Sequence, residues 1–277
     1  MVEVLASDRS VSARGDRFAV WSAAVTSLLA VVSFALAVTT PPRTGPFAQA
    51  AVLIKYPYAE ASRFVPRDFL WMYPATLMML AFVVLAACIL HRASARLRLF
   101  GVIGVCLATV SFTVIVIDYF IQLRTVQVAL LRGEASSVVA LSQYNPHGVF
   151  IALEEAGFLV AAVSFVFLAL ALASSRPERW ARRVFLAAAA LTLLTLVGMS
   201  VAFGLGVEYR FEVFSIMIVW LTLAPSARSW RGRSPGLRGT SWRASPGRSS
   251  SSGRRRRSST SSATSATSHA TTRRCSR

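Results

Sequence analysis

The chain has 277 residues, of which 55% are hydrophobic and 15% are charged, and its formal net charge is +18. An average soluble domain carries about 25% charged residues, so this composition excludes an ordinary water-soluble fold. The charge is unevenly placed, because residues 225–277 include thirteen Arg and no acid, whereas the first 224 residues hold 17 basic and 12 acidic side chains, a net charge of +5. The basicity therefore belongs to the C-terminal tail.

Long apolar runs dominate the first 224 residues. A helix needs about 20 apolar residues to cross about 30 Å of hydrocarbon. Five runs meet that length: 18–39, 69–90, 99–121, 149–173 and 184–205. A sixth run, 211–224, begins in the same manner but stops at Pro225, and at about 1.5 Å per residue it reaches only about 21 Å. The sequence predicts an all-α, polytopic transmembrane bundle with five secure spans and a short sixth, over 18–224.

Basic residues gather in the N-terminal segment and in the second and fourth loops. In a multi-pass protein these three segments lie on the same side of the membrane. These are the N-terminal segment 1–17 (Arg9, Arg14, Arg17), the second loop (Arg92, Arg96, Arg98) and the fourth loop (Arg176, Arg179, Arg182, Arg183). Because Lys and Arg near membrane ends resist translocation, we predict a multi-pass protein of the cell (plasma) membrane with both termini in the cytoplasm. The alternative for the first run is a cleaved signal peptide, since Ala35-Leu36-Ala37 resembles a peptidase site, although the run exceeds the usual signal core.

The tail, 225–277, consists mostly of Arg, Ser, Gly, Pro, Thr and Ala. Such a composition predicts disorder, because it offers too little apolar surface to offset the entropy of ordering. A basic arm suits anionic lipid head groups, and nucleic acid is not the partner we expect. Two alternatives stay open. Either the charge has no dedicated partner, or the tail is a frameshift product that interrupts a complete sixth helix near residues 223–225.

Ionisable residues inside the apolar runs are the candidate functional residues, since a charge at mid-helix costs about 2.5–3.5 kcal/mol on insertion scales. Glu154 and Glu155 lie about two turns inside the fourth run, Asp118 lies near the end of the third, and Glu212 stands at the start of the sixth. On the predicted topology these acids are all nearer the outer face. Together with His147 they form a candidate proton or cation site.

The segment 145–148 (NPHG) is typical of a helix start, with Asn145 as the cap and Pro146 in the first helical position. His147 and Glu154 would then be seven residues apart on one face of the helix, with Glu155 about 100° further round. A His with a half-buried carboxylate suits proton transfer or cation binding. The structural alternative is an interhelical hydrogen bond from one glutamate to a nearby polar side chain, Gln143, Tyr144 or Tyr119.

Other patterns favour packing over chemistry. Gly157 with Ala161, and Gly198 with Ala202, have the small-residue spacing that lets helices approach closely. The sequence has no Walker loop, HExxH, CxxC, nucleophile elbow or GxGxxG motif. Its three cysteines predict no disulfide framework, and a lone His gives weak support for a metal. We therefore predict neither a metal nor a cofactor, and we lean against an enzyme.

Three segments carry a resemblance to known sequences: PRDFLWMYP (66–74), DYFIQ (118–122) and QYNPHGVFIALEE (143–155). In these segments the chain resembles a group of uncharacterised bacterial polytopic integral membrane proteins, over residues from about 18 to 222. The third segment is the most specific, and the tail has no counterpart in the group. The resemblance implies the helical architecture and adds no mechanism.

These observations leave three classes of function. The first is a small-solute, proton or cation transporter or sensor that uses His147, Glu154, Glu155, Asp118 or Glu212. The second is a membrane-embedded enzyme or metal-dependent protein that uses the same residues. The third is a structural membrane subunit whose buried acids only hold helices together.

Overall fold

The protein is a helical bundle, and the computed structural model describes residues 2–172 and 176–225, with side chains for 15–172 and 178–225. The predictions for the tail, namely its disorder, its binding to lipid head groups and its origin in a frameshift, lie outside the described residues from position 226 onward. Within the described ranges all regular structure is helical, which confirms the predicted all-α class.

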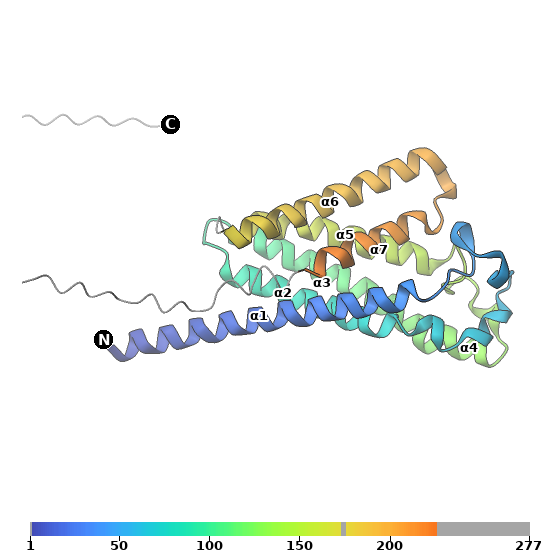
Figure 1. Ribbon diagram of the computed structural model, residues 1–277, viewed down its shortest axis with the longest axis horizontal. Helices are drawn as coiled ribbons and strands as arrows, with labels where there is room; N and C mark the ends of the chain where they lie inside the picture. Colours follow the sequence, from blue (N-terminus) through green and yellow to red (C-terminus); the bar gives the residue numbers. More distant parts are fainter. Residues whose placement is uncertain (1, 173–175, 226–277) are drawn as a thin grey trace, which may run out of the picture. The chain divides into compact units, whose positions relative to one another are not determined.

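Six helices follow the six apolar runs (Figure 1). They are α1 (Val2–Val38), α2 (Met72–Arg92), α3 (Arg98–Ile121), α5 (Val149–Ala171), α6 (Arg176–Phe203) and α7 (Tyr209–Leu223). Five helical stretches in the described residues are long and apolar enough to span a membrane, and α7, with 15 residues, is the short sixth. The multi-pass architecture therefore agrees with the prediction.

Two helix boundaries differ from the prediction. The third run does not end at Ile121, because a π-helical turn (Gln122–Val126) and the short helix α4 (Gln127–Leu131) continue it. The fourth helix begins at Val149 and not at Pro146. The side chain of Asn145 accepts a hydrogen bond from the His147 N–H (3.0 Å), so it closes a local turn instead of capping the helix. His147 consequently lies before α5.

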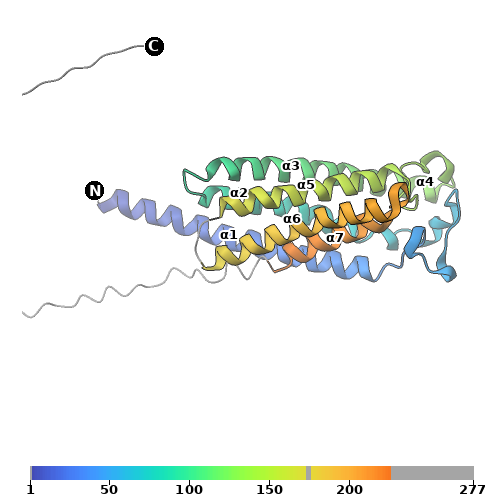
Figure 2. The ribbon, with the colours of Figure 1, turned by 90° about the horizontal axis from the view of Figure 1, so that it is seen from above.

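Helices α1, α2, α3, α5 and α7 pack in a closed order, since each contacts the next and α7 returns to α1. Helix α5 lies centrally, because it also contacts α2 and α6, whereas α6 packs mainly on α5 and α7 (Figures 1 and 2). The segments 39–71, 132–148 and 204–208 join the helices at one end of the bundle (Figure 1), which we call the loop end.

The contact between α3 and α5 is built on small residues. A Cβ atom at Gly157 would lie 2.6 Å from Cδ1 of Ile115, and one at Gly104 would lie 2.8 Å from Cδ2 of Leu168. Each close approach carries an interhelical hydrogen bond, from the Ser111 hydroxyl to the Gly157 carbonyl (2.7 Å) and from the Ser164 hydroxyl to the Gly104 carbonyl (2.8 Å). The predicted packing role of Gly157 is confirmed. Gly198 has no such neighbour within 4 Å in the part of the chain that the structure describes.

Candidate functional site

Three acids from three helices meet inside the bundle: Asp118 of α3, Glu154 of α5 and Glu212 of α7. All three side chains are buried. The Glu154 and Glu212 carboxyl groups are close enough to interact directly, and Asp118 lies within electrostatic range of both. We call these residues the carboxyl cluster.

The carboxyl cluster is only partly satisfied by hydrogen bonds. The hydroxyl of Tyr119 donates to Oε1 of Glu154, which is one of the three bonds that the structural alternative predicted. Oδ2 of Asp118, Oε2 of Glu154 and Oε2 of Glu212 have no partner among the described residues. The described chain also contains no ion pair to any of the three acids. Three buried carboxyl groups therefore lie together with no basic side chain of the described residues as a counter-ion.

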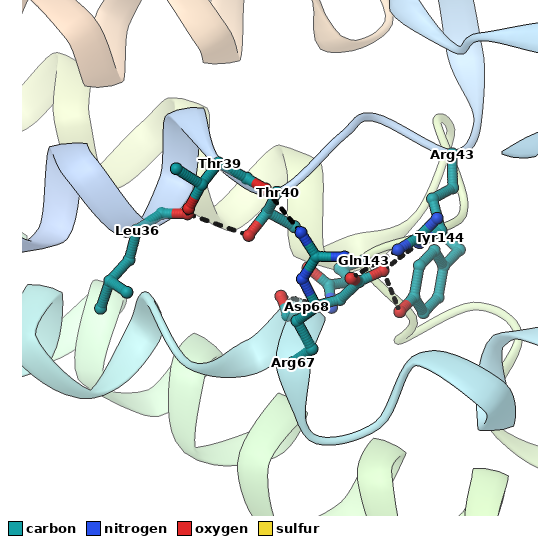
Figure 3. Close-up of polar contacts among 8 residues, drawn as sticks. All are labelled: Leu36, Thr39, Thr40, Arg43, Arg67, Asp68, Gln143 and Tyr144. Atoms are coloured by element: carbon teal, nitrogen blue, oxygen red, sulfur yellow. Dashed lines mark hydrogen bonds and ion pairs between the residues drawn. The ribbon is translucent and has the colours of Figure 1, made fainter.

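A second buried polar group closes the loop end, centred on an ion pair between Arg43 and Asp68 (Figure 3). Nη2 of Arg43 donates to Oδ1 of Asp68 (2.9 Å), and the Tyr144 hydroxyl donates to Oδ2 (3.2 Å). The Arg43 guanidinium also stacks over the Phe64 ring, 3.3 Å from its centroid. Burial, and then the negative charge of Asp68, raise the pKa of Tyr144, so its phenol stays protonated and donates. The positive charge of Arg43 is thus paired with the carboxylate of Asp68.

Further hydrogen bonds tie the loops to the helices around this ion pair. Nη2 of Arg67 donates to the carbonyl of Thr39 at the end of α1 (3.0 Å; Figure 3). The Tyr209 hydroxyl, at the start of α7, donates to the carbonyl of Gln143 (2.7 Å) and lies 2.8 Å from the Thr44 hydroxyl. Gly45 lies against the Tyr209 ring with a φ of +71°, where a Cβ atom would meet Cδ2 of that ring at 2.2 Å. Only glycine fits this turn.

A partly open cavity of about 340 Å³ lies between these two polar groups. Its lining includes Glu212 of the carboxyl cluster and both members of the Arg43–Asp68 pair. Buried aromatic residues form much of the remainder, and exposed apolar residues such as Pro42 and Met217 stand at its edge. Trp71 lines the cavity and packs edge-on against Tyr119, with ring centroids 5.3 Å apart. Tyr119 in turn bonds Glu154, which does not line the cavity, whereas Glu212 belongs both to the cavity lining and to the carboxyl cluster.

The structure brings together three of the five residues that the sequence proposed. Glu154, Asp118 and Glu212 form the carboxyl cluster, while Glu155 is half-buried one position further round α5. The His147 side chain is 66% exposed, with Nε2 4.0 Å from Oε1 of Glu208 at the surface. The predicted stripe of His147 and Glu154 does not form, because His147 precedes the helix and no longer shares its periodicity.

Arg43 and Tyr209 line the cavity, and sequence reasoning did not identify either of them. Arg43 is one of four basic residues spread between the first two apolar runs, and its partner Asp68 is 25 positions away. Tyr209 contacts a residue 165 positions away. One available signal was Asp68, an acid immediately before the apolar run 69–90 with no basic residue at helical spacing on its C-terminal side.

Comparisons with known proteins add nothing to these observations. No family model, no curated protein and no solved structure matches the chain. The resemblance to bacterial membrane proteins therefore stays a prediction. In the described residues no group of three or more His, Cys, Asp and Glu side chains could hold a metal ion. The protein is thus a multi-pass membrane-type helical protein with a buried carboxyl cluster beside a cavity.

Proposed function

We propose that the protein is a proton-coupled transporter or sensor of a small solute, in which the carboxyl cluster holds the proton. The observation that carries this proposal is the meeting of Asp118, Glu154 and Glu212 without a counter-ion among the described residues. An isolated charge in a membrane interior is expensive, and neighbouring carboxylates repel one another. Such a group is stable only when it holds protons or a cation, so its occupancy responds to pH or to a ligand.

The cavity supplies the route between this cluster and the outside. Because Glu212 lines the cavity and interacts with Glu154 behind it, a solute in the cavity would reach the first of the three acids without unfolding the bundle. Ionisable groups that act on Glu212 come from several helices. They are Asp118, Tyr119, Glu154, Glu155 and Tyr209. A change of charge at Glu212 would therefore alter its electrostatic interactions with residues of α3 and α5 as well as of α7.

Infrared spectroscopy of the full-length protein in lipid bilayers tests the proton-holding role directly. Protonated carboxylic acids give a carbonyl band that ionised carboxylates lack. We expect this band to be present at neutral pH and to decline as pH rises further. Glu154→Gln and Glu212→Gln should each remove part of it. Glu134→Gln, which changes an exposed loop acid, is the control and should leave it intact. A cluster that stays ionised throughout, or a band untouched by both substitutions, would refute the proposal.

A structural role is the second candidate, and the hydrogen bond from Tyr119 to Glu154 favours it, because this bond joins α3 to α5. Glu154→Gln separates the two candidates. The amide oxygen of Gln accepts the same hydrogen bond, so a purely structural Glu154 predicts unchanged thermal stability and no pH-dependent infrared band. A proton-holding Glu154 predicts that the band diminishes while the protein still folds.

The topology is part of the same proposal. The distribution of arginines supports a plasma-membrane protein with the loop end outside and both termini in the cytoplasm. A single cysteine introduced at the exposed loop residue Glu60 should react with a membrane-impermeant maleimide on intact cells. Protection of that cysteine until the cells are opened would reverse the orientation.

A further inference from the structure

The charges that line the cavity do not cancel. Arg43, Asp68 and Glu212 are the only charged residues in its described lining, and Arg43 is paired with Asp68 by two hydrogen bonds. One acid, Glu212, remains without a basic partner. Its side chain is 6% exposed, and its Oε2 atom has no hydrogen-bond partner in the described residues. The cavity therefore offers one buried carboxyl group, with no basic partner in the described residues, to whatever enters it.

The rest of the lining is predominantly apolar and aromatic. Trp71, Phe150 and Trp220 are buried there, and Trp71 and Trp220 pack against each other with ring centroids 5.9 Å apart. Indole and phenyl rings attract cations through their electron-rich faces, and they also bury apolar surface. A volume of about 340 Å³ lies within the range of small-molecule sites. An inorganic cation would leave most of this apolar lining uncovered.

We infer that the cavity binds a small lipophilic organic cation of single positive charge, such as an aryl-substituted ammonium, with Glu212 as its counter-ion. This inference rests on the proposed function and names the class of its solute. Ionisation of the one unpaired carboxyl group of the lining selects one positive charge, and the aromatic lining selects an organic body. Anions are disfavoured because Arg43 is already neutralised by Asp68.

Binding of such a cation and protonation of Glu212 exclude each other. In the empty protein the carboxyl O–H bond holds the proton. When the cation enters, that O–H bond breaks, the proton leaves to solvent through the cavity, and the carboxylate pairs with the cation. The net charge of the site is unchanged, which avoids burying an unpaired ion. Since protons compete with the cation, affinity rises with pH, by about tenfold per pH unit for one displaced proton.

Calorimetry with benzyltrimethylammonium tests the inference on the full-length protein in detergent. This probe keeps its charge at every pH, so any proton released comes from the protein. Titrations in two buffers of different ionisation enthalpy should report about one proton released per cation, and binding should tighten as pH rises. Benzyl alcohol and benzenesulfonate carry the same ring with no charge and with negative charge, and neither should bind comparably.

Two variants decide whether the probe occupies this cavity. Glu212→Gln should weaken binding by at least about tenfold and abolish proton release, whereas Glu60→Gln, an exposed loop acid, should change neither. Met217→Trp fills the cavity from its exposed edge without altering an acid, so it should weaken binding while leaving the infrared band intact. This second variant keeps the test valid should Glu212→Gln fail to fold.

Several results would overturn the inference. They are equal binding of benzyl alcohol or benzenesulfonate, unchanged binding in Met217→Trp or in folded Glu212→Gln, and binding without proton release. An infrared band that titrates and depends on Glu212, together with no binding of benzyltrimethylammonium, would reject the cation class and leave the proton-holding function standing. The absence of that band would reject the proposed function itself.

Discussion

Helices α5 and α6 look alike as sequence and behave differently in the fold. Their apolar windows have mean hydropathies of 2.0 and 2.3, and each carries a glycine and an alanine four residues apart. Half of the α5 window is buried, against 22% of the α6 window. Gly157 of α5 lies against Ile115 of α3, whereas Gly198 of α6 has no neighbour within 4 Å. Hydropathy thus measures transfer out of water and does not distinguish a protein neighbour from lipid.

The largest difference between the two helices should appear on truncation of large side chains. Phe158 of α5 is fully buried, and Leu194 of α6 is 69% exposed. Phe158→Ala should destabilise the protein by about 3–5 kcal/mol through lost packing and a cavity. Leu194→Ala should cost less than about 0.5 kcal/mol. Thermal unfolding in detergent, followed by circular dichroism, measures both, and a similar cost for the two would erase the distinction.

Added volume at the two glycines should give an intermediate effect. In Gly157→Val the new Cβ would lie within 2.7 Å of two Ile115 side-chain atoms, so we expect a loss of about 1–3 kcal/mol from overpacking. Gly198→Val meets open space and serves as the matched control. The same unfolding measurement applies. Destabilisation by Gly198→Val alone would mean that α6 has a protein neighbour at this position, for example a second copy of the chain.

The smallest effects should come from hydroxyl groups. Ser111→Ala removes the hydrogen bond to Gly157 of the neighbouring helix and should cost roughly 0.5–1.5 kcal/mol. Among the described residues the Thr195 hydroxyl of α6 bonds only the Leu191 carbonyl of its own helix. Thr195→Ser, which keeps the hydroxyl, and Thr195→Ala should therefore both be near neutral. Equal losses of stability for Ser111→Ala and Thr195→Ala would contradict a stabilising hydrogen bond between α3 and α5 at Ser111.

Several parts of the candidate site were predictable, each for a physical reason. Glu154 stood out because an acid flanked by apolar residues must find a polar partner, and Tyr119 was among the three partners expected. His147 was misplaced because the NPHG segment forms a turn before α5, so helical spacing did not apply to it. The packing expected at Gly198 finds no neighbour among the described residues for a related reason, since small-residue spacing permits a close approach and does not supply the neighbour.

The sequence by itself determined the number and order of the apolar helices, because a bilayer-sized apolar run has few other stable conformations once its backbone must satisfy its own hydrogen bonds. It also pointed to Asp118, Glu154 and Glu212 as acids in the apolar runs, and all three are buried, whereas Glu155 is only half-buried. Only the tertiary structure decided which faces meet. The pairing of Arg43 with Asp68, the contact of Tyr209 with Thr44 and the meeting of three acids from α3, α5 and α7 all join distant segments. No local pattern encodes such contacts, since they depend on helix rotation and packing.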